Sequence, residues 1–385
     1  MLDKNYDVVV IGGGQAGLVC GYYLAKTKLK YVILDKNQTQ GGSWLNTWDS
    51  LKLFSPANHS SLSGMFMPKS LEEYPSKKEV IDYLKIYEER FKLNVLREIN
   101  VTNIEFFDEE YFINYQNYNQ NNNLEQIIKS KFIINATGTF DQAFIPSYNN
   151  ISQFAGKILH SSHYTNAMEF MGSKVLIVGG GNSAAQILAE VSMVAETKWA
   201  TLTPPNFLPD NVDGRDLFYF ATAAYQKGTK QEDKGEDFCG VSSLGDIVMV
   251  ASVKEARRRN VIHRNGNIID FYKDGVVWEN GINNDGIKIK EAEIKEEFDA
   301  VIFCTGFGSN LKHLENLSSL LDNKNRVILK ERDFITQPIF ESKTYENMYF
   351  IGYGNWTGYA SATLIGVGRF AKMAIEEINN KSKEI

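Results

Sequence analysis

Residues 6–20 read Tyr-Asp-Val-Val-Val-Ile-Gly-Gly-Gly-Gln-Ala-Gly-Leu-Val-Cys, and this stretch decides the fold. The apolar run that ends at Ile11 is typical of a buried parallel strand. Three glycines in the spacing G-x-G-x-x-G follow: Gly12, Gly14 and Gly17. We expect a helix over residues 15–26 and a second strand over residues 31–34. The stretch therefore predicts a strand, glycine turn, helix and strand, which is the unit that binds a dinucleotide.

Each glycine has its own physical role in such a unit. Gly12 permits the tight turn out of the strand, Gly14 lets the backbone approach a pyrophosphate, and Gly17 lets the helix pack closely on the strand. The pyrophosphate is expected on the free N–H groups at the N-terminus of the helix. Asp35 follows the second strand, about 20 residues on, where a carboxylate accepts hydrogen bonds from a ribose hydroxyl.

The second half of the chain repeats this unit. A strand is expected over residues 174–178, and residues 179–184 then read Gly-Gly-Gly-Asn-Ser-Ala, an accepted variant of the same fingerprint. A helix over residues 182–195 and a strand over residues 199–202 complete the repeat. Two such units predict two dinucleotides, with FAD at the first site and NADH or NADPH at the second, and hydride passing between them.

The segments around the two units complete an α/β fold with two Rossmann-like dinucleotide-binding domains. An amphipathic helix is expected over residues 77–92, and residues 114–123 are expected at an exposed hairpin tip. A strand over residues 348–351 would return the chain to the sheet of the first domain. The predicted boundaries are residues 1–165 and 303–385 for a discontinuous FAD domain, and 166–302 for the inserted NAD(P)H domain.

Composition excludes several function classes. The chain has 385 residues, 43% of them hydrophobic, and a net charge of −6, which indicates neither a nucleic-acid footprint nor a basic membrane-binding face. The first strand is too short for a signal peptide or a membrane span, so we expect a cytoplasmic protein. The three cysteines lie far apart, with no C-x-x-C pair, which argues against a metal site and a redox-active disulfide: Cys20, Cys239 and Cys304.

The predicted site residues come from the glycine turns, the strand ends beside them, the glycine-rich loop after Asp35 and the start of the last helix. For FAD they are Gly12, Gly14, Gln15, Ala16, Gly17, Asp35, Lys36, Gly42, Ser43, Trp44, Ser50, Ala136, Thr137, Gly138, Thr363 and Leu364. For NAD(P)H they are Gly179, Gly181, Asn182, Ser183, Ala184, Leu202, Thr203, Thr305 and Gly306. Trp44 is expected near a flat ring system of the first cofactor, and the alternative is that it fills the core.

The end of the strand over residues 199–202 bears on the choice between NADH and NADPH. Leu202 and Thr203 offer no cation that would attract a 2′-phosphate and no acid that would repel it. We therefore expect relaxed specificity, with NADH a competent donor and the two values of kcat/KM within about tenfold. The alternative is that Lys198 or Arg215 supplies the missing cation.

The chain resembles the flavin-containing monooxygenases. Their identifying pattern, F-x-G-x-x-x-H-x-x-x-Y, occurs between the two units as Phe154, Gly156, His160 and Tyr164. The Gly-Gly-Ser-Trp loop and the run over residues 355–368 are similar to a bacterial short-chain branch that includes arsenic-resistance-type flavin monooxygenases. The resemblance covers nearly the whole chain. We expect His160 to be a positioned structural residue at the domain junction rather than an acid or base.

The resemblance implies an FAD-dependent monooxygenase. NAD(P)H would reduce the flavin, dioxygen would form a flavin hydroperoxide, and oxygen would pass to a small molecule: a thioether, an amine, or a ketone in the Baeyer–Villiger manner. Many members place an asparagine beside the flavin to stabilise the peroxide, but that position here falls on Pro56, which has no donor. Asn58 is the candidate substitute. The alternative is an NAD(P)H oxidase or flavoprotein reductase that releases hydrogen peroxide.

Two further classes stay open at this point. A flavoprotein disulfide reductase shares the two-nucleotide layout, but it needs a cysteine pair that this sequence lacks. A non-catalytic redox sensor is the other, and steady consumption of NADH with dioxygen would exclude it. The sequence does not identify the physiological substrate, and a homodimer is one of the oligomeric states left open.

Overall fold

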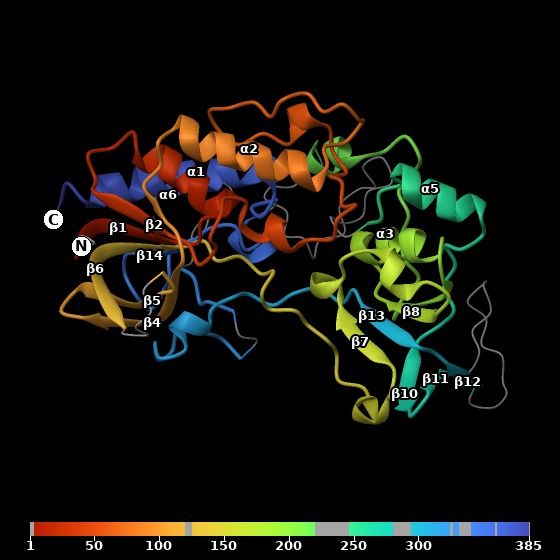
Figure 1. Ribbon diagram of the computed structural model, residues 1–385. Coiled ribbons are helices and arrows are strands. Elements are labelled where there is room, and N and C mark those ends of the chain that lie inside the picture. The colour runs from red at the N-terminus through yellow and green to blue at the C-terminus, as the bar shows by residue number, and fades with distance from the viewer. Residues whose placement is uncertain are drawn as a thin grey trace.

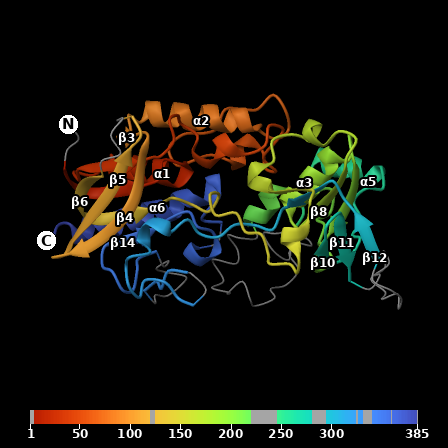
Figure 2. The same cartoon turned by 60° about the horizontal axis from the view of Figure 1, so that its bottom comes forward.

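Two α/β lobes make up the protein, which we describe from a computed structural model (Figure 1). The structure describes residues 4–119, 125–219, 246–279, 294–323, 326–330, 340–358 and 360–384. Strand β1 (Asn5–Ile11) opens the first lobe, and β8 (Lys174–Val178) carries the second glycine turn in the other lobe. A view turned by 60° keeps the two lobes apart (Figure 2). Cys239 lies outside the described residues.

The first lobe is built on a seven-stranded sheet in the order β3-β2-β1-β6-β5-β4, with β14 also paired to β6. Its other strands are β2 (Tyr31–Leu34), β3 (Val95–Leu96), β4 (Ile99–Phe107), β5 (Glu110–Asn117), β6 (Gln126–Asn135) and β14 (Met348–Phe350). Strand β1 pairs in parallel with β2 on one side and with β6 on the other. Because β14 pairs in parallel with β6, the chain returns to complete the first sheet, as the sequence predicts.

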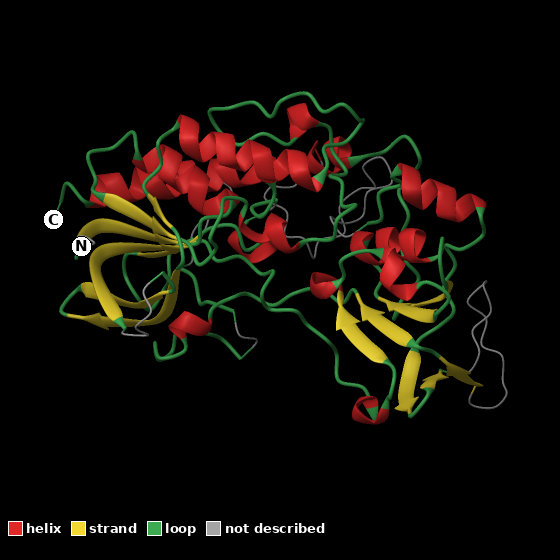
Figure 3. Cartoon of the chain, in the orientation of Figure 1, coloured by secondary structure: helices red, strands yellow, loops and turns green. Residues whose placement is uncertain are grey.

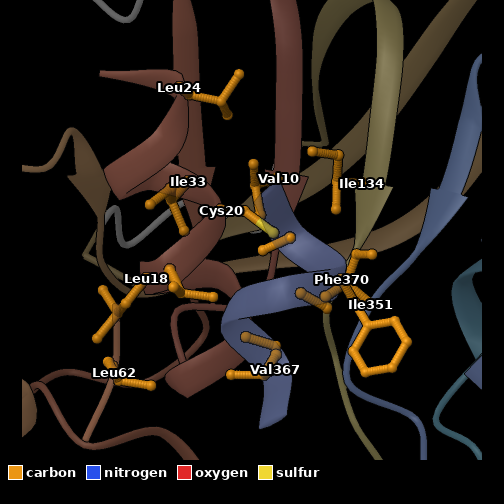
Figure 4. Packing of buried hydrophobic residues seen from close by; sticks show 14 of the residues in the cluster. Val10, Leu18, Cys20, Leu24, Ile33, Leu62, Ile134, Ile351, Val367 and Phe370 are labelled. Atoms are coloured by element: carbon orange, nitrogen blue, oxygen red, sulfur yellow. The ribbon is translucent and has the colours of Figure 1, made fainter. Parts of the chain in front are cut away.

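Three helices cover one face of this sheet (Figure 3): α1 (Gln15–Leu24), α2 (Lys77–Arg90) and α6 (Leu364–Lys381). Helix α2 begins at a capping box, in which the Ser76 hydroxyl and the Glu79 carboxylate each accept a backbone N–H of the other residue. Helices α1 and α6 pack on β1 through a hydrophobic core that includes Val10, Cys20 and Phe370 (Figure 4). Burial raises the pKa of the Cys20 thiol, so this cysteine is an inert core residue.

The second lobe is built on a four-stranded parallel sheet in the order β7-β13-β8-β9. Its other elements are β7 (Lys157–His160), α3 (Asn182–Val191), β9 (Glu196–Ala200), α5 (Ala251–Arg258), β13 (Ala300–Phe303) and an antiparallel sheet of β10 (Ile268–Tyr272), β11 (Gly275–Trp278) and β12 (Ile294–Glu297). Short 3₁₀ helices lie in the connections: Gly42–Asn46, Ala57–His59, Ile151–Gln153, Ser161–His163, Ala167–Phe170, Lys312–Leu314 and Asn355–Thr357.

The predicted helices end two to four residues early, and three further departures from the sequence-based expectations change where residues lie. Strand β9 ends at Ala200, so Leu202 lies beyond it and is 78% exposed. Asn114 is buried, because it lies within β5 between two neighbouring strands and not at a hairpin tip; residues 120–124 of that tip lie outside the described residues. Residues 157–160 pair with β13, so sheet membership places them in the second lobe, before the expected boundary at residue 165.

Two chain segments cross between the lobes side by side. Ala143 and Phe307 form an antiparallel bridge, and the Phe144 amide donates to the Gly306 carbonyl at 3.1 Å. The rings of Phe140 and Phe307 stack with their centroids 5.4 Å apart. This paired crossing runs between the carboxyl ends of the parallel strands β6 and β13 of the two sheets. Within the described ranges, no helix has the length and apolar character needed to cross a bilayer.

Candidate functional site

The first cavity lies at the carboxyl ends of β1, β2 and β6 and has a volume of about 600 Å³. Twelve of the sixteen residues predicted to bind FAD line it: Gly12, Gly14, Gln15, Ala16, Asp35, Lys36, Gly42, Ser43, Trp44, Ala136, Thr137 and Gly138. Ligands of open parallel sheets bind at this end of the strands. The fold therefore brings residues from four separate parts of the chain to one place.

The three glycines of the first turn differ in what a side chain would meet. A Cβ on Gly17 would lie 1.8 Å from the Gly12 carbonyl oxygen, and a Cβ on Gly12 would lie 2.4 Å from the Ala136 oxygen. A Cβ on Gly14 would meet only Gly42, at 3.8 Å, and would project into open space. No side chain caps helix α1 at its N-terminus. An open approach to uncapped N–H groups fits the pyrophosphate of a dinucleotide.

Asp35 is buried and is held by a cation that the sequence patterns do not reveal. Arg97 forms an ion pair with Asp35 and a second one with Glu88, and all three side chains are largely buried. Burial raises the pKa of the Asp35 carboxyl, against the opposing pull of Arg97. The Asn37 side-chain amide also donates to Asp35, at 3.1 Å. A buried carboxylate needs such partners, and these partners fix the orientation of Asp35, the residue predicted to bind the ribose.

Trp44 lies at the junction of two cavities. Its indole Nε1–H donates to Gln15 Oε1 at 3.0 Å, which holds the ring beside the first turn of α1. Trp44 lines both the first cavity and a cavity between the lobes. This position favours contact with a bound ring system over the alternative of core filling.

Other predicted residues are not brought to the first cavity. Gly17 packs inside the turn, and the Ser50 hydroxyl donates to Glu190 of α3 at 2.6 Å. Thr363 caps α6 and Leu364 is buried in the core, so that the preceding Ala362 lines the cavity instead. Asn58 is exposed, lies 2.9 Å from the His59 Nδ1 atom and is absent from the lining of the cavities described here. This placement does not support a role for Asn58 beside the flavin.

The second cavity, of about 630 Å³, lies at the carboxyl ends of β8, β9 and β13. Four residues predicted to bind NAD(P)H line it: Gly179, Leu202, Thr203 and Thr305. Gly181 caps α3, and a Cβ placed on it would meet nothing within 4 Å, so the second turn repeats the open approach of the first. The residues at this turn thus also fit a dinucleotide.

The remaining predicted residues of the second site have other positions. The Asn182 side chain donates to the Asp246 carbonyl and accepts from the Val248 amide, both at 2.9 Å. Ala184 is buried in the core, and Gly306 lies in the crossing segment. Cys304 lines the second cavity, but burial raises the pKa of its thiol to about 12, which makes it a small filler and not a nucleophile.

A third cavity, of about 280 Å³, lies between the two lobes. The first lobe and the crossing segments contribute mainly apolar side chains: Trp44, Trp48, Leu51, Leu53, Phe54, Phe140 and Phe307. Helix α3 contributes polar ones: Asn182, Ser183 and Gln186. Trp44 and Phe307 also line the first cavity, so the two spaces adjoin. The sequence patterns do not reveal this third cavity, because it is assembled by the packing of the lobes.

A family model described as "Pyridine nucleotide-disulphide oxidoreductase" matches residues 9–203, which span the first glycine turn and the second. The chain belongs to this oxidoreductase family. The matched residues include both glycine turns, and so they include residues that line the first and the second cavity. Family membership and the two cavities together confirm the α/β fold with two nucleotide-binding lobes and the prediction that the protein is an enzyme.

Similarity to individual proteins gives a narrower enzyme class for this oxidoreductase than the family model does. The flavin-containing monooxygenase from Stenotrophomonas maltophilia is 39% identical, with a TM-score of 0.82 over 99% of this chain and 100% of that chain. The oxidoreductase CzcO from Bacillus velezensis is 30% identical over 376 residues, covering 97% of this chain and 99% of that protein. The probable indole-3-pyruvate monooxygenase YUCCA8 from Arabidopsis thaliana is 26% identical over 217 residues, covering 55% of this chain and 51% of that protein.

These similarities confirm the resemblance to bacterial flavin-containing monooxygenases and the use of FAD and NAD(P)H. They support a flavin-dependent monooxygenase acting on a small molecule with dioxygen. Despite the family name, the two described cysteines of this oxidoreductase, Cys20 and Cys304, are both free and lie in different lobes. The thiol pair of a disulfide reductase is therefore not formed by the described residues.

His160 of this oxidoreductase ends β7 beside the crossing segments. Its ring packs edge-on against Phe307, with the centroids 4.9 Å apart, and its Nδ1 atom accepts the Ser162 amide at 3.1 Å. Burial lowers the pKa of the imidazole, so that the neutral form predominates near neutral pH. These contacts favour the expectation that His160 is structural, because they tie the strand end to the segment that lines the first cavity.

Proposed function

We propose that this enzyme uses NAD(P)H and dioxygen to oxygenate a small apolar molecule at a soft nucleophile, such as a thioether or an amine, or to insert oxygen beside a ketone in the Baeyer–Villiger manner. The observation that carries the proposal is the apolar cavity between the lobes, which adjoins the first nucleotide cavity. A substrate there would lie beside Trp44, at the end of the space assigned to FAD. Its mainly apolar surface suits an uncharged substrate.

Bound FAD and NAD(P)H would supply hydride transfer and the activation of dioxygen. The residues of the chain bind and orient the two nucleotides and the substrate, and they exclude water. The backbone at Gly14 and Gly181 admits the two pyrophosphates, and the segment from Thr305 to Phe307 connects the two cavities, because its first residue lines one and its last residue lines the other. The stacked rings of Phe140 and Phe307 keep water from the space between them.

The alternative is an oxidase that releases hydrogen peroxide, and one observation favours it. Pro56 has no donor, and the exposed Asn58 amide lies against His59 instead of reaching a cavity. Asn182, which lines the third cavity, is already engaged: its side chain donates to the Asp246 carbonyl and accepts the Val248 amide.

The test is a panel of substrates given to the purified, FAD-loaded enzyme: a thioether, a tertiary amine, a cyclic ketone and a trivalent arsenical. Oxygenated product, hydrogen peroxide and NAD(P)H consumption are measured together. Product formation that accounts for most of the NAD(P)H consumed is the expected result. Peroxide equal to the NAD(P)H consumed, with no product from any class, would contradict oxygenation and support the oxidase.

A matched pair of variants tests the location of the substrate. Phe54 lines the third cavity, whereas Phe66 is 85% exposed and lines none of the cavities described here. Phe54→Ala should raise the KM for the best substrate by fivefold or more, and Phe66→Ala should leave it unchanged. Equal effects of the two changes would contradict the placement. A homodimer and a cytoplasmic location stay predictions.

A further inference from the structure

A cation that the sequence patterns do not reveal, Arg264, lies at the end of β9. Strand β9 ends at Ala200, and the next three residues, Thr201 to Thr203, line the second cavity. The Arg264 guanidinium lies against them. Its Nε–H donates to the Thr201 carbonyl at 3.0 Å and to the Thr201 hydroxyl at 2.9 Å, and its Nη2 atom donates to the Leu202 carbonyl at 3.2 Å.

The backbone around Arg264 is fixed by pairing with the same strand. The Thr201 amide donates to the Gly266 carbonyl at 3.0 Å, and the Asn265 side chain accepts the Trp199 amide at 2.9 Å. Ala200 and Gly266 form a parallel bridge. Residues 264–266 thus extend the edge of the sheet beside β9, and the position of the guanidinium does not depend on its own side-chain contacts alone.

The two cations that the sequence suggests for this place have acidic partners. Lys198 lies 3.8 Å from Glu296, and the Arg215 Nε atom lies 3.0 Å from the Asp213 carboxylate. Among the described residues, no carboxylate lies within ion-pair distance of Arg264. Arg264 is therefore the cation at the end of β9 whose charge the described residues leave uncompensated.

We propose that Arg264 binds the 2′-phosphate of NADPH and makes the enzyme prefer NADPH to NADH. The residues after the second strand of a dinucleotide unit meet the substituent on the 2′ position of the ribose. An arginine has five N–H donors. The contacts with Thr201 and Leu202 use the Nε–H and one Nη2–H, which leaves three for a phosphate, in the forked geometry that suits bidentate binding.

This inference rests on the proposed placement of NAD(P)H in the second cavity, and it replaces the relaxed specificity expected from Leu202 and Thr203. The sequence patterns do not reveal Arg264, because a long segment of the chain separates it from β9. It reaches the end of that strand only through the pairing of Ala200 with Gly266. Its neighbours in the sequence carry no nucleotide-binding pattern that would have indicated it.

The test compares Arg264→Ala and Arg264→Lys with a matched control, Arg259→Ala. Arg259 donates to the carbonyls of Ala189 and Ser192 at the end of α3, so it has the same kind of contacts but makes them away from Thr201 and Leu202, which line the second cavity. Two quantities are measured at low and at high salt. One is the second-order rate constant of anaerobic flavin reduction by NADPH and by NADH, and the other is the binding of adenosine 2′,5′-bisphosphate and of 5′-AMP by calorimetry.

Arg264→Ala should lower the NADPH rate constant and the bisphosphate affinity about tenfold, and the loss should be larger at low salt because the contact is ionic. The values for NADH and 5′-AMP should stay within twofold, Arg264→Lys should keep part of the preference, and Arg259→Ala should change neither ratio. Equal losses for both nucleotides, or an unchanged ratio in Arg264→Ala, would overturn the inference. If neither nucleotide reduces the wild-type flavin, the proposed function fails, whereas the bisphosphate titration still decides the role of Arg264.

Discussion

The change Gly14→Ala separates the folding of the first glycine turn from its binding of FAD. Gly14 has φ −79° and ψ −171°, an extended conformation that any residue adopts. The added Cβ would lie 3.8 Å from the nearest heavy atom, the Gly42 Cα, which is an ordinary contact distance. The free energy of unfolding of the apoprotein should therefore change by no more than about 0.5 kcal/mol.

The same Cβ projects into the first cavity, where the pyrophosphate of FAD is expected to approach the backbone. Loss of one hydrogen bond to a charged group costs about 1.5–3 kcal/mol, so FAD should bind roughly 10–150-fold more weakly. Gly14→Val should bind still less. The assay is a fluorescence titration of the apoprotein with FAD, together with urea unfolding of the same apoprotein.

Gly308→Ala is the matched control for this experiment. Its Cβ would lie 3.6 Å from the Gln142 Cβ and outside the lining of the first cavity, so both stability and FAD affinity should stay at wild-type values. Full FAD affinity in Gly14→Ala and Gly14→Val would refute the placement of the pyrophosphate. Unfolding of the Gly14→Ala apoprotein would refute the claim that this glycine serves the ligand and not the fold.

Three further predictions follow from the same geometry. Gly17→Ala would bring a Cβ within 1.8 Å of the Gly12 oxygen, and should destabilise the apoprotein by about 3 kcal/mol in urea unfolding; a wild-type midpoint would contradict this. Burial lowers the pKa of His313 to about 4, below its value in the unfolded chain, so the free energy of unfolding should fall by about 3 kcal/mol as the pH drops from 6.5 toward 4. His313→Gln should weaken this dependence of the unfolding free energy on pH, and an unchanged dependence would contradict the prediction. Leu202→Arg should raise the preference for NADPH, most at low salt, and an unmoved preference would contradict the placement of the ribose at the end of β9.

The sequence predicts the two glycine units well because their signals are local. The strands over residues 31–34 and 174–178 have the predicted bounds, since each apolar run is followed at once by residues that do not continue it: Asp35 after the first and Gly179 after the second. The first cavity is also assembled largely from predicted residues, because all of them follow strands whose carboxyl ends meet at one edge of the sheet.

The parts that the sequence does not predict depend on contacts between distant segments. Arg97 reaches Asp35 from beyond α2, and Arg264 reaches the end of β9 through an edge pairing. The spacing from the glycine-rich loop puts the expected asparagine position on Pro56 and makes Asn58 only the candidate substitute, and in the structure Asn58 lies in a 3₁₀ turn and is exposed. The lobe boundary expected at residue 165 differs from the sheet membership of β7 for a similar reason, because neither strand alone indicates that β7 pairs with β13.

The central claim is that two separate nucleotide sites act in one reaction, and anaerobic bleaching of the flavin tests it most directly. NADPH should bleach the flavin absorbance of the wild-type enzyme. A Cβ at Gly181 meets nothing within 4 Å, and the account expects the pyrophosphate of NADPH at this turn, so Gly181→Val should keep its FAD and still be bleached by dithionite, but not by NADPH. Normal bleaching of Gly181→Val by NADPH would contradict the two-site account.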